Sequence, residues 1–121
     1  MHVFLVEDAP AIRTRLAQML GEIKGVEIVG EADTPAAAID GILRSTAASV
    51  VLDLQLVGGS GIEVLRTVHP LRPDIAFIVL TNHATDQYRK ICMEAGADYF
   101  LDKSTEIQKV KDLIAALGAA R

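Results

Sequence analysis

The sequence lacks the features that mark secreted, membrane-spanning or nucleic-acid-binding proteins. It contains a single cysteine, Cys92, which excludes a disulfide within the chain. No apolar run approaches the ~18 residues needed to span a bilayer, and the N-terminal segment reaches two acids too soon for a signal peptide. Twelve basic residues against sixteen acidic ones give a net charge of −4, without a dense Lys/Arg run. We therefore expect a cytoplasmic protein that binds neither membranes nor nucleic acid directly.

Aromatic residues are also scarce, with three phenylalanines, two tyrosines and no tryptophan. Half of the residues are nonetheless hydrophobic, and the mean hydropathy is +0.31, which argues against disorder. The core must therefore be built mainly from valine, isoleucine, leucine and alanine. A length of 121 residues suits one domain of ordinary size.

Strand-like and helix-like segments alternate along the whole chain, which is typical of a parallel sheet covered by helices on both faces. The expected strands cover residues 2–7, 26–33, 49–53, 74–81 and 97–102. Helices are expected to follow them over residues 10–21, 35–43, 60–70, 85–95 and 105–117. The last helix has a capping-box pattern at Thr105 and Gln108, and Gly118 is its expected stop. The sequence thus predicts an α/β fold of five strand-helix units, (βα)5.

Polar residues stand where four of these strands end. The carboxyl ends of parallel strands meet at one edge of a sheet, where ligands of doubly wound folds bind. The residues at this edge are Glu7, Asp8, Asp53, Thr81 and Lys103. Three neighbouring carboxylates repel one another unless a cation offsets them, and oxygen ligands with access to water suit Mg²⁺. We therefore expect Mg²⁺ to be the cofactor.

The lysine and the threonine indicate phosphoryl chemistry. An ammonium and a hydroxyl facing a carboxylate beside Mg²⁺ match the needs of phosphoryl oxygens. Asp53, at the end of the apolar run 49–52, is the candidate nucleophile that would form an acyl phosphate. The glycine-rich loop 58–61 would keep the approach to it open.

From Val3 to Leu117 the sequence resembles the receiver domain of two-component response regulators, on the strength of these motifs. The resemblance implies a flavodoxin-like doubly wound five-stranded parallel sheet with strand order 2-1-3-4-5. It implies that Asp53 takes a phosphoryl group from a phosphohistidine on a sensor histidine kinase or a histidine phosphotransfer protein. It also implies that the Mg²⁺ ligands are Glu7, Asp8, Asp53 and the backbone carbonyl of Gln55.

The resemblance further implies a conformational switch. The phosphoryl group would draw the Thr81 hydroxyl inward, and the aromatic ring of Phe100 would rotate into the vacated space. Tyr99 is the weaker candidate, because alternation along a strand directs it to the opposite face. The switched surface would signal to a downstream protein or output domain, and a phosphorylation-dependent homodimer is one arrangement that fits.

Several positions depart from the family pattern. Glu7 stands where aspartate is commoner, and Ser104 replaces the proline that usually follows the lysine. A cis peptide at that position is therefore in question, because non-proline cis bonds cost ~2.5–4 kcal/mol. Gln55 and His83 flank the expected phosphoryl site, and we hypothesise that they tune the rate of autodephosphorylation.

The sequence leaves alternatives to this interpretation. Residues 1–121 are expected to form one receiver domain, with no output domain. This receiver is expected to catalyse only its own phosphorylation and autodephosphorylation. The chain could equally be the receiver of a longer DNA-binding regulator, cut from its output domain. A Mg²⁺-dependent phosphohydrolase is a less favoured alternative, because such enzymes usually carry a second acid at the position of Gln55. A module that is never phosphorylated would be expected to have lost the lysine, the threonine or the acids.

Overall fold

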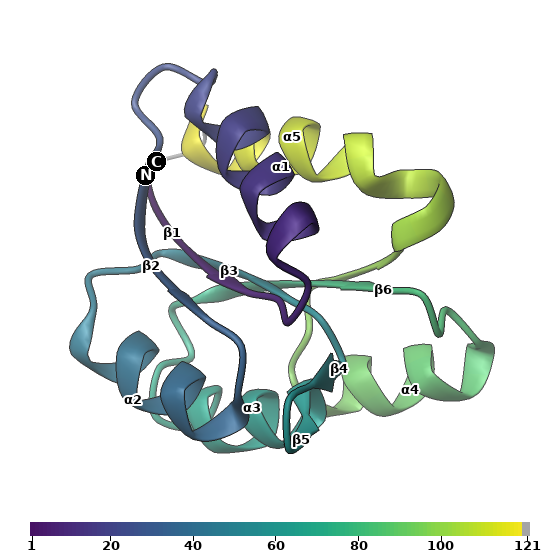
Figure 1. The fold of residues 1–121 in the computed structure, drawn as a ribbon. Coiled ribbons are helices and arrows are strands. Elements are labelled where there is room, and N and C mark those ends of the chain that lie inside the picture. Colours follow the sequence, from purple (N-terminus) through teal and green to yellow (C-terminus); the bar gives the residue numbers. More distant parts are fainter. Residues whose placement is uncertain (120–121) are drawn as a thin grey trace.

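The computed structural model describes residues 1–119 as a central parallel sheet between two layers of helices (Figure 1). The sheet contains five strands, in the spatial order β2-β1-β3-β6-β7. In chain order these are β1 (His2–Val6), β2 (Glu27–Ala32), β3 (Ser49–Leu52), β6 (Ala76–Thr81) and β7 (Tyr99–Asp102). All neighbouring pairs are parallel, so the predicted order 2-1-3-4-5 is confirmed.

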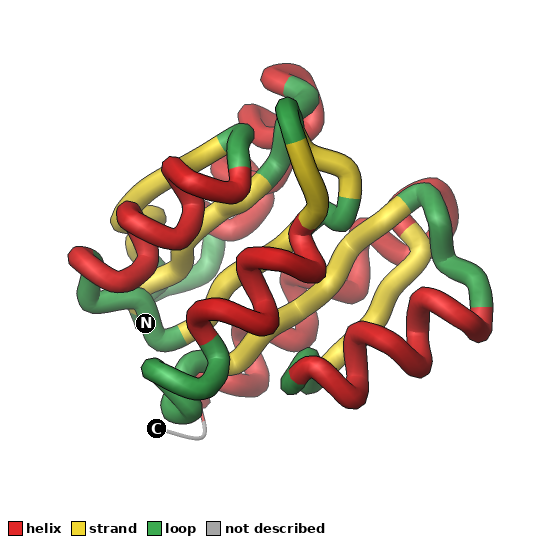
Figure 2. Tube along the Cα trace, turned by 90° about the horizontal axis from the view of Figure 1, so that it is seen from below, coloured by secondary structure: helices red, strands yellow, loops and turns green. Residues whose placement is uncertain are grey.

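Helices cover both faces of the sheet. Helices α1 (Pro10–Gly21) and α5 (Lys103–Ala119) lie on one face. The other face carries α2 (Pro35–Arg44), α3 (Gly61–Val68) and α4 (Asp86–Ala95), which lie side by side when seen from below (Figure 2). Within residues 1–119, no helix combines the length and apolar character that crossing a bilayer requires.

The central strands bury side chains on both faces, which explains why their sequences are apolar without alternation. Along β1, Val3 and Leu5 belong to the buried cluster that includes residues of α1 and α5, whereas Phe4 and Val6 belong to the cluster that includes residues of α2, α3 and α4. Two buried clusters result, one on each side of the sheet. The aliphatic core on both faces holds the sheet rigid behind the edge at which the candidate residues stand.

Most of the helix boundaries follow local signals that the sequence contains. Thr34, Ser60 and Thr85 each accept a backbone N–H bond at the start of their helix, at 3.1–3.2 Å. Gly96 ends α4 in the left-handed conformation with φ of +115°, as expected of a helix-terminating glycine.

The boundaries predicted for the last helix were wrong. Helix α5 begins at Lys103, directly after β7, rather than at Thr105, and it continues through Gly118 to Ala119. The early start has a clear cause, because the side chain of Asp102 accepts the backbone N–H of Ser104 and thereby caps the helix two residues earlier. No cis peptide bond occurs within residues 1–119, so the Lys103–Ser104 bond is trans.

The glycine-rich loop after β3 contains structure that the sequence did not predict. Strands β4 (Gln55–Leu56) and β5 (Gly59–Ser60) pair as a short antiparallel hairpin. Its turn includes Gly58 at φ of +76°, a conformation that L side chains rarely adopt. The hairpin places Gln55 and Ser60 opposite each other beside the carboxyl end of β3.

Candidate functional site

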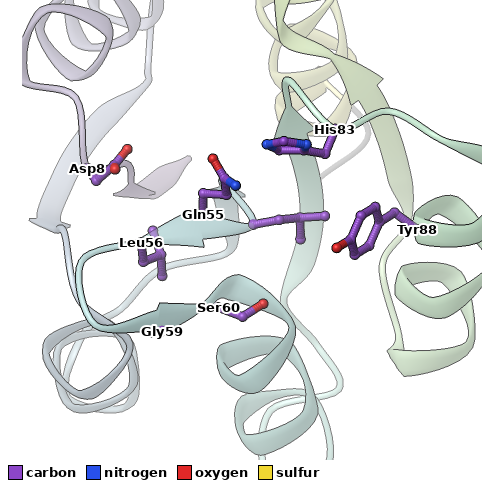
Figure 3. A pocket seen from close by; sticks show the side chains of 8 residues that line it. Asp8, Gln55, Leu56, Gly59, Ser60, His83 and Tyr88 are labelled. Atoms are coloured by element: carbon purple, nitrogen blue, oxygen red, sulfur yellow. The ribbon is translucent and has the colours of Figure 1, made fainter.

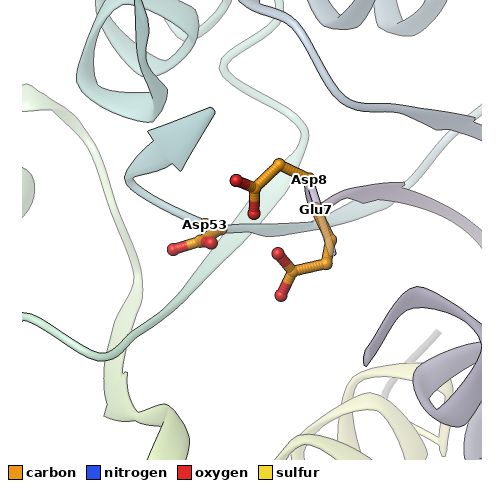
Figure 4. A group of neighbouring side chains, drawn as sticks. All are labelled: Glu7, Asp8 and Asp53. Carbon is orange, nitrogen blue, oxygen red and sulfur yellow. The ribbon is translucent and has the colours of Figure 1, made fainter. Parts of the chain in front are cut away.

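Three carboxylates meet at the carboxyl ends of β1 and β3, as the sequence predicted. Oxygen atoms of Glu7, Asp8 and Asp53 all lie within 4.8 Å of one another (Figure 4). Glu7 and Asp53 are almost fully buried, at 2% and 5% exposure, whereas Asp8 is accessible to solvent. The cluster is therefore a concentration of negative charge at the edge of an apolar sheet, open to water on the Asp8 side.

Lys103 supplies the positive charge that faces this cluster. Its ammonium lies 2.6 Å from Glu7 Oε1 and 2.8 Å from Asp53 Oδ2, and its side chain is only 9% exposed. The sequence predicted that Lys103 would face the site, but not that it would join the first acid to the third. Because Glu7 is one methylene longer than aspartate, its carboxylate can reach Lys103 from the end of β1.

Burial perturbs the titration of both members of this ion pair. Desolvation raises the pKa of Glu7 to about 7, and the charge of Asp53 adds to this against the opposing effect of Lys103. For Lys103, burial alone would lower the pKa, but hydrogen bonds to Asp53 and Glu7 outweigh it and raise the pKa. Lys103 therefore stays protonated, while the Glu7 carboxyl titrates near neutral pH. A further cation at the cluster would favour the ionised form of Glu7.

Backbone contacts hold the two buried carboxylates in place. Asp53 Oδ1 accepts the Leu54 N–H at 2.7 Å, and Glu7 Oε2 accepts the Ala9 N–H at 3.2 Å. Arg13, in the first turn of α1, donates to the backbone carbonyl of Glu7 at 2.8 Å. Residue 61 must be glycine here, because a Cβ at Gly61 would collide with the backbone carbonyl of Asp53. No motif in the sequence signals the role of Arg13.

Thr81 and Phe100 lie on the two strands beside the cluster. Thr81 is fully buried at the end of β6, and its hydroxyl accepts the His83 N–H at 3.1 Å. Phe100 is 4% exposed in the core on the α2–α4 side, and the Arg89 guanidinium lies 4.9 Å from its ring centroid. Tyr99 is more than one-third exposed. The structure thus distinguishes the two aromatics as alternation predicted, with Phe100 buried beside the strand that carries Thr81.

A pocket of about 410 Å³ adjoins the acidic cluster (Figure 3). Its walls come from the β4–β5 hairpin, the segments after β1 and β6, and the first turn of α4. They include Asp8, Gln55, Ser60, His83 and Tyr88. Gln55 and His83, predicted to flank the site, therefore do line one cavity together with a cluster carboxylate. The rings of His83 and Tyr88 make an edge contact with centroids 6.4 Å apart.

Tyr88 is a wall residue that the sequence analysis did not identify. It stands in the first turn of α4, where its backbone N–H donates to the capping hydroxyl of Thr85. The predicted helix start at Thr85 was the available signal, because it places Tyr88 in the first helical turn, directly after the segment that carries His83.

The donor set at the acidic cluster fits a hard divalent cation. The three side-chain ligands are all carboxylate oxygens, and the exposed Asp8 gives access to the waters that Mg²⁺ usually retains. The short hairpin brings Gln55 to the same pocket as Asp8. The cluster of Glu7, Asp8 and Asp53 could therefore hold a metal ion.

Comparisons with known proteins give a consistent result. The family model described as "Response regulator receiver domain" matches residues 3–115. The chain is 30% identical over 119 residues to the DNA-binding transcriptional activator DevR/DosR of Mycobacterium tuberculosis, covering 98% of this chain and 55% of that protein. It is 30% identical over 114 residues to the response regulator UvrY of Escherichia coli, covering 94% of this chain and 52% of that protein.

A solved structure agrees with these relatives. A LuxR-family two-component response regulator from Aurantimonas sp. SI85-9A1 superposes with a TM-score of 0.89 at 28% sequence identity. The match covers 99% of this chain and 86% of that one. The chain spans about half the length of the two curated relatives named above.

Proposed function

Since the chain belongs to the family of response regulator receiver domains, we propose that it is a signalling phosphoacceptor in which Asp53 receives a phosphoryl group from a phosphohistidine. The donor would be a sensor histidine kinase or a histidine phosphotransfer protein. One observation carries the proposal, namely that the Asp53 carboxylate is paired with Lys103 and lies within 4.8 Å of the carboxylates of Glu7 and the solvent-accessible Asp8.

The chain's own residues supply most of what such a transfer needs. A carboxylate oxygen of Asp53 would form the new O–P bond while the donor's N–P bond breaks, and the released imidazole takes up a proton. The Lys103 ammonium, 2.8 Å from Asp53 Oδ2, would offset charge on the phosphoryl oxygens. Mg²⁺, held by Glu7, Asp8, Asp53 and the Gln55 backbone carbonyl, would neutralise further charge there.

The proposed switch follows from the placement of Thr81 and Phe100. A phosphoryl group on Asp53 offers acceptor oxygens to the Thr81 hydroxyl, in competition with its contact to the His83 backbone. Movement of the segment after Thr81 would change the packing around Phe100 and the adjacent Arg89. The charge change at the site would thereby shift the population between two packings of β6, α4 and β7.

The proposal is tested by incubating the protein with acetyl phosphate, or with a phosphorylated histidine kinase, in the presence of Mg²⁺. We expect intact-protein mass spectrometry to show a gain of one phosphoryl group. Removal of divalent cations with EDTA should abolish the gain from acetyl phosphate, because the clustered carboxylates would then repel the anionic donor. Absence of any mass gain with both donors would contradict the proposed function.

Gln55 and His83 are proposed to set the lifetime of the phosphorylated state. Both line the pocket next to Asp8, where an attacking water would approach the phosphoryl group. We expect Gln55→Ala and His83→Ala each to change the rate of phosphoryl loss several-fold, by roughly the twofold to tenfold that altered positioning of one water allows. The decay of pre-phosphorylated protein gives the rate. Unchanged decay in both variants would exclude this role.

A DNA-binding output is a second proposal, supported by a relative. DevR/DosR is described as a DNA-binding activator, and the present chain spans about half of its length. We propose that the receiver controls such an output domain in a longer protein. Reading the complete open reading frame tests this directly, since a DNA-binding domain after residue 121 would support it and an immediate stop codon would contradict it.

A further inference from the structure

The junction between β7 and α5 contains a closed set of hydrogen bonds around Lys103. Asp102 is the last residue of the strand and Lys103 the first of the helix, so no loop separates them. Asp102 Oδ1 accepts both the Ser104 N–H at 2.9 Å and the Ser104 hydroxyl at 2.6 Å. In the other direction, the Asp102 N–H donates to Glu106 Oε1 at 3.0 Å. These three bonds join Asp102, directly before Lys103, to Ser104 and Glu106 after it, and so span Lys103.

The sheet also holds Asp102 in place from the side. Asp102 pairs in register with Thr81, at the end of the neighbouring strand β6. The backbone that leads into Lys103 is therefore tied to β6 by the sheet and to the first turn of α5 by its cap. Neither Asp102 nor Ser104 contacts the acidic cluster itself in the hydrogen bonds and ion pairs described for residues 1–119.

From this geometry we propose that Asp102, with Ser104, is a positioning residue that directs the Lys103 ammonium toward Asp53 and Glu7. A lysine has a flexible four-carbon stem, and a fixed backbone limits the space that its ammonium samples. The Lys103 ammonium must be held at one position to make its two contacts, at 2.6 Å to Glu7 and 2.8 Å to Asp53. The inference rests on the proposed function, because it assigns the cap a role in phosphoryl transfer.

The test compares Asp102→Ala with Asp102→Asn, because asparagine retains the acceptor oxygen and caps helices about as well as aspartate. With acetyl phosphate and saturating Mg²⁺, we expect Asp102→Ala to be phosphorylated about tenfold more slowly, as slight misplacement of a reacting group allows. Asp102→Asn should stay within about twofold of the wild type, because its hydrogen bonds persist. Asp112→Ala, which removes an acid elsewhere on α5, should leave the rate unchanged.

A second measurement reads the position of Lys103 without phosphorylation. Acetylation of amines by acetic anhydride is followed by peptide mass spectrometry, with the exposed Lys90 on α4 as the internal reference. We expect the Lys103-to-Lys90 labelling ratio to rise severalfold in Asp102→Ala and to stay at the wild-type value in Asp102→Asn. Global stability alone would not change this ratio in folded protein. Because Ser104 is exposed, Ser104→Ala provides the same test with a smaller rise should Asp102→Ala fail to fold.

The outcomes separate the two proposals. An Asp102→Ala protein with wild-type phosphorylation rate and labelling would overturn the positioning role, and so would an Asp102→Asn protein as impaired as Asp102→Ala. If wild-type protein accepts no phosphoryl group, the proposed function fails, while the labelling ratio still decides whether Asp102 positions Lys103.

Discussion

Replacing Asp53 with asparagine is expected to abolish the gain of a phosphoryl group while leaving the fold intact. The amide lacks the nucleophilic carboxylate, so no acyl phosphate can form. Its carbonyl oxygen can still accept the Leu54 N–H that Asp53 Oδ1 accepts, which preserves the local backbone. The measurement is intact-protein mass after incubation with acetyl phosphate and Mg²⁺.

The matched control for this loss is Asp112→Asn on α5. Asp112 is exposed and lies on α5 more than two turns after Lys103, away from the acidic cluster. Its replacement by asparagine changes the net charge by the same amount as Asp53→Asn. This variant should gain the phosphoryl group as the wild type does. An Asp53→Asn protein that still gained the full mass would show that another residue is the acceptor, with Asp8, the exposed carboxylate of the cluster, the first to examine.

Replacing Lys103 with methionine should destabilise the metal-free protein strongly. The change keeps an apolar stem but leaves Glu7 and Asp53 buried without their cation, which costs about 3 kcal/mol of unfolding free energy. Urea denaturation at pH 8 in EDTA measures this. The variant should also accept a phosphoryl group at least about tenfold more slowly, since one charged contact to the phosphoryl oxygens is lost.

The loss of unfolding free energy in Lys103→Met should depend on pH. With Lys103 in place, the pKa of Glu7 is raised to about 7, and loss of Lys103, which opposes this rise, raises it further. The folded variant therefore holds a proton on Glu7 that the unfolded chain does not bind near neutral pH, so its stability rises as pH falls from 8 to 6. Protonation removes one of the two uncompensated charges, and the deficit of Lys103→Met should therefore shrink at pH 6. Lys109→Met, which breaks an exposed pair with Glu106, should change stability by no more than about 0.5 kcal/mol. Equal stabilities for Lys103→Met and wild type would contradict the assigned ion cluster.

The fold could be predicted from the sequence because its signals are local and repeated. Unbroken apolar strands such as residues 49–52, helix caps such as Thr34 and the glycine at position 96 all act within a few residues of themselves. The strand order came from the family resemblance, and the parallel ladders confirm it. The gathering of Glu7, Asp8, Asp53 and Lys103 followed once the strands were known to be parallel, because their ends share one edge.

The features that escaped prediction depend on contacts between segments or on competition between similar local signals. Both Asp102 and Thr105 could cap the last helix, and only the structure shows that Asp102 does, through Ser104 and Glu106. The bond from Arg13 to the Glu7 carbonyl depends on how α1 packs, which the spacing of apolar residues does not determine. The β4–β5 hairpin is too short for a strand pattern to reveal it.

The measurement that tests the central claim most directly is the chemical identity of the modified residue. Protein phosphorylated with acetyl phosphate and Mg²⁺ is treated with borohydride, which reduces an aspartyl phosphate to homoserine with release of phosphate, and is then mapped by peptide mass spectrometry. The account predicts homoserine at position 53 and unmodified aspartate at position 8. A modification that resists borohydride, or homoserine at any position other than 53, would contradict it.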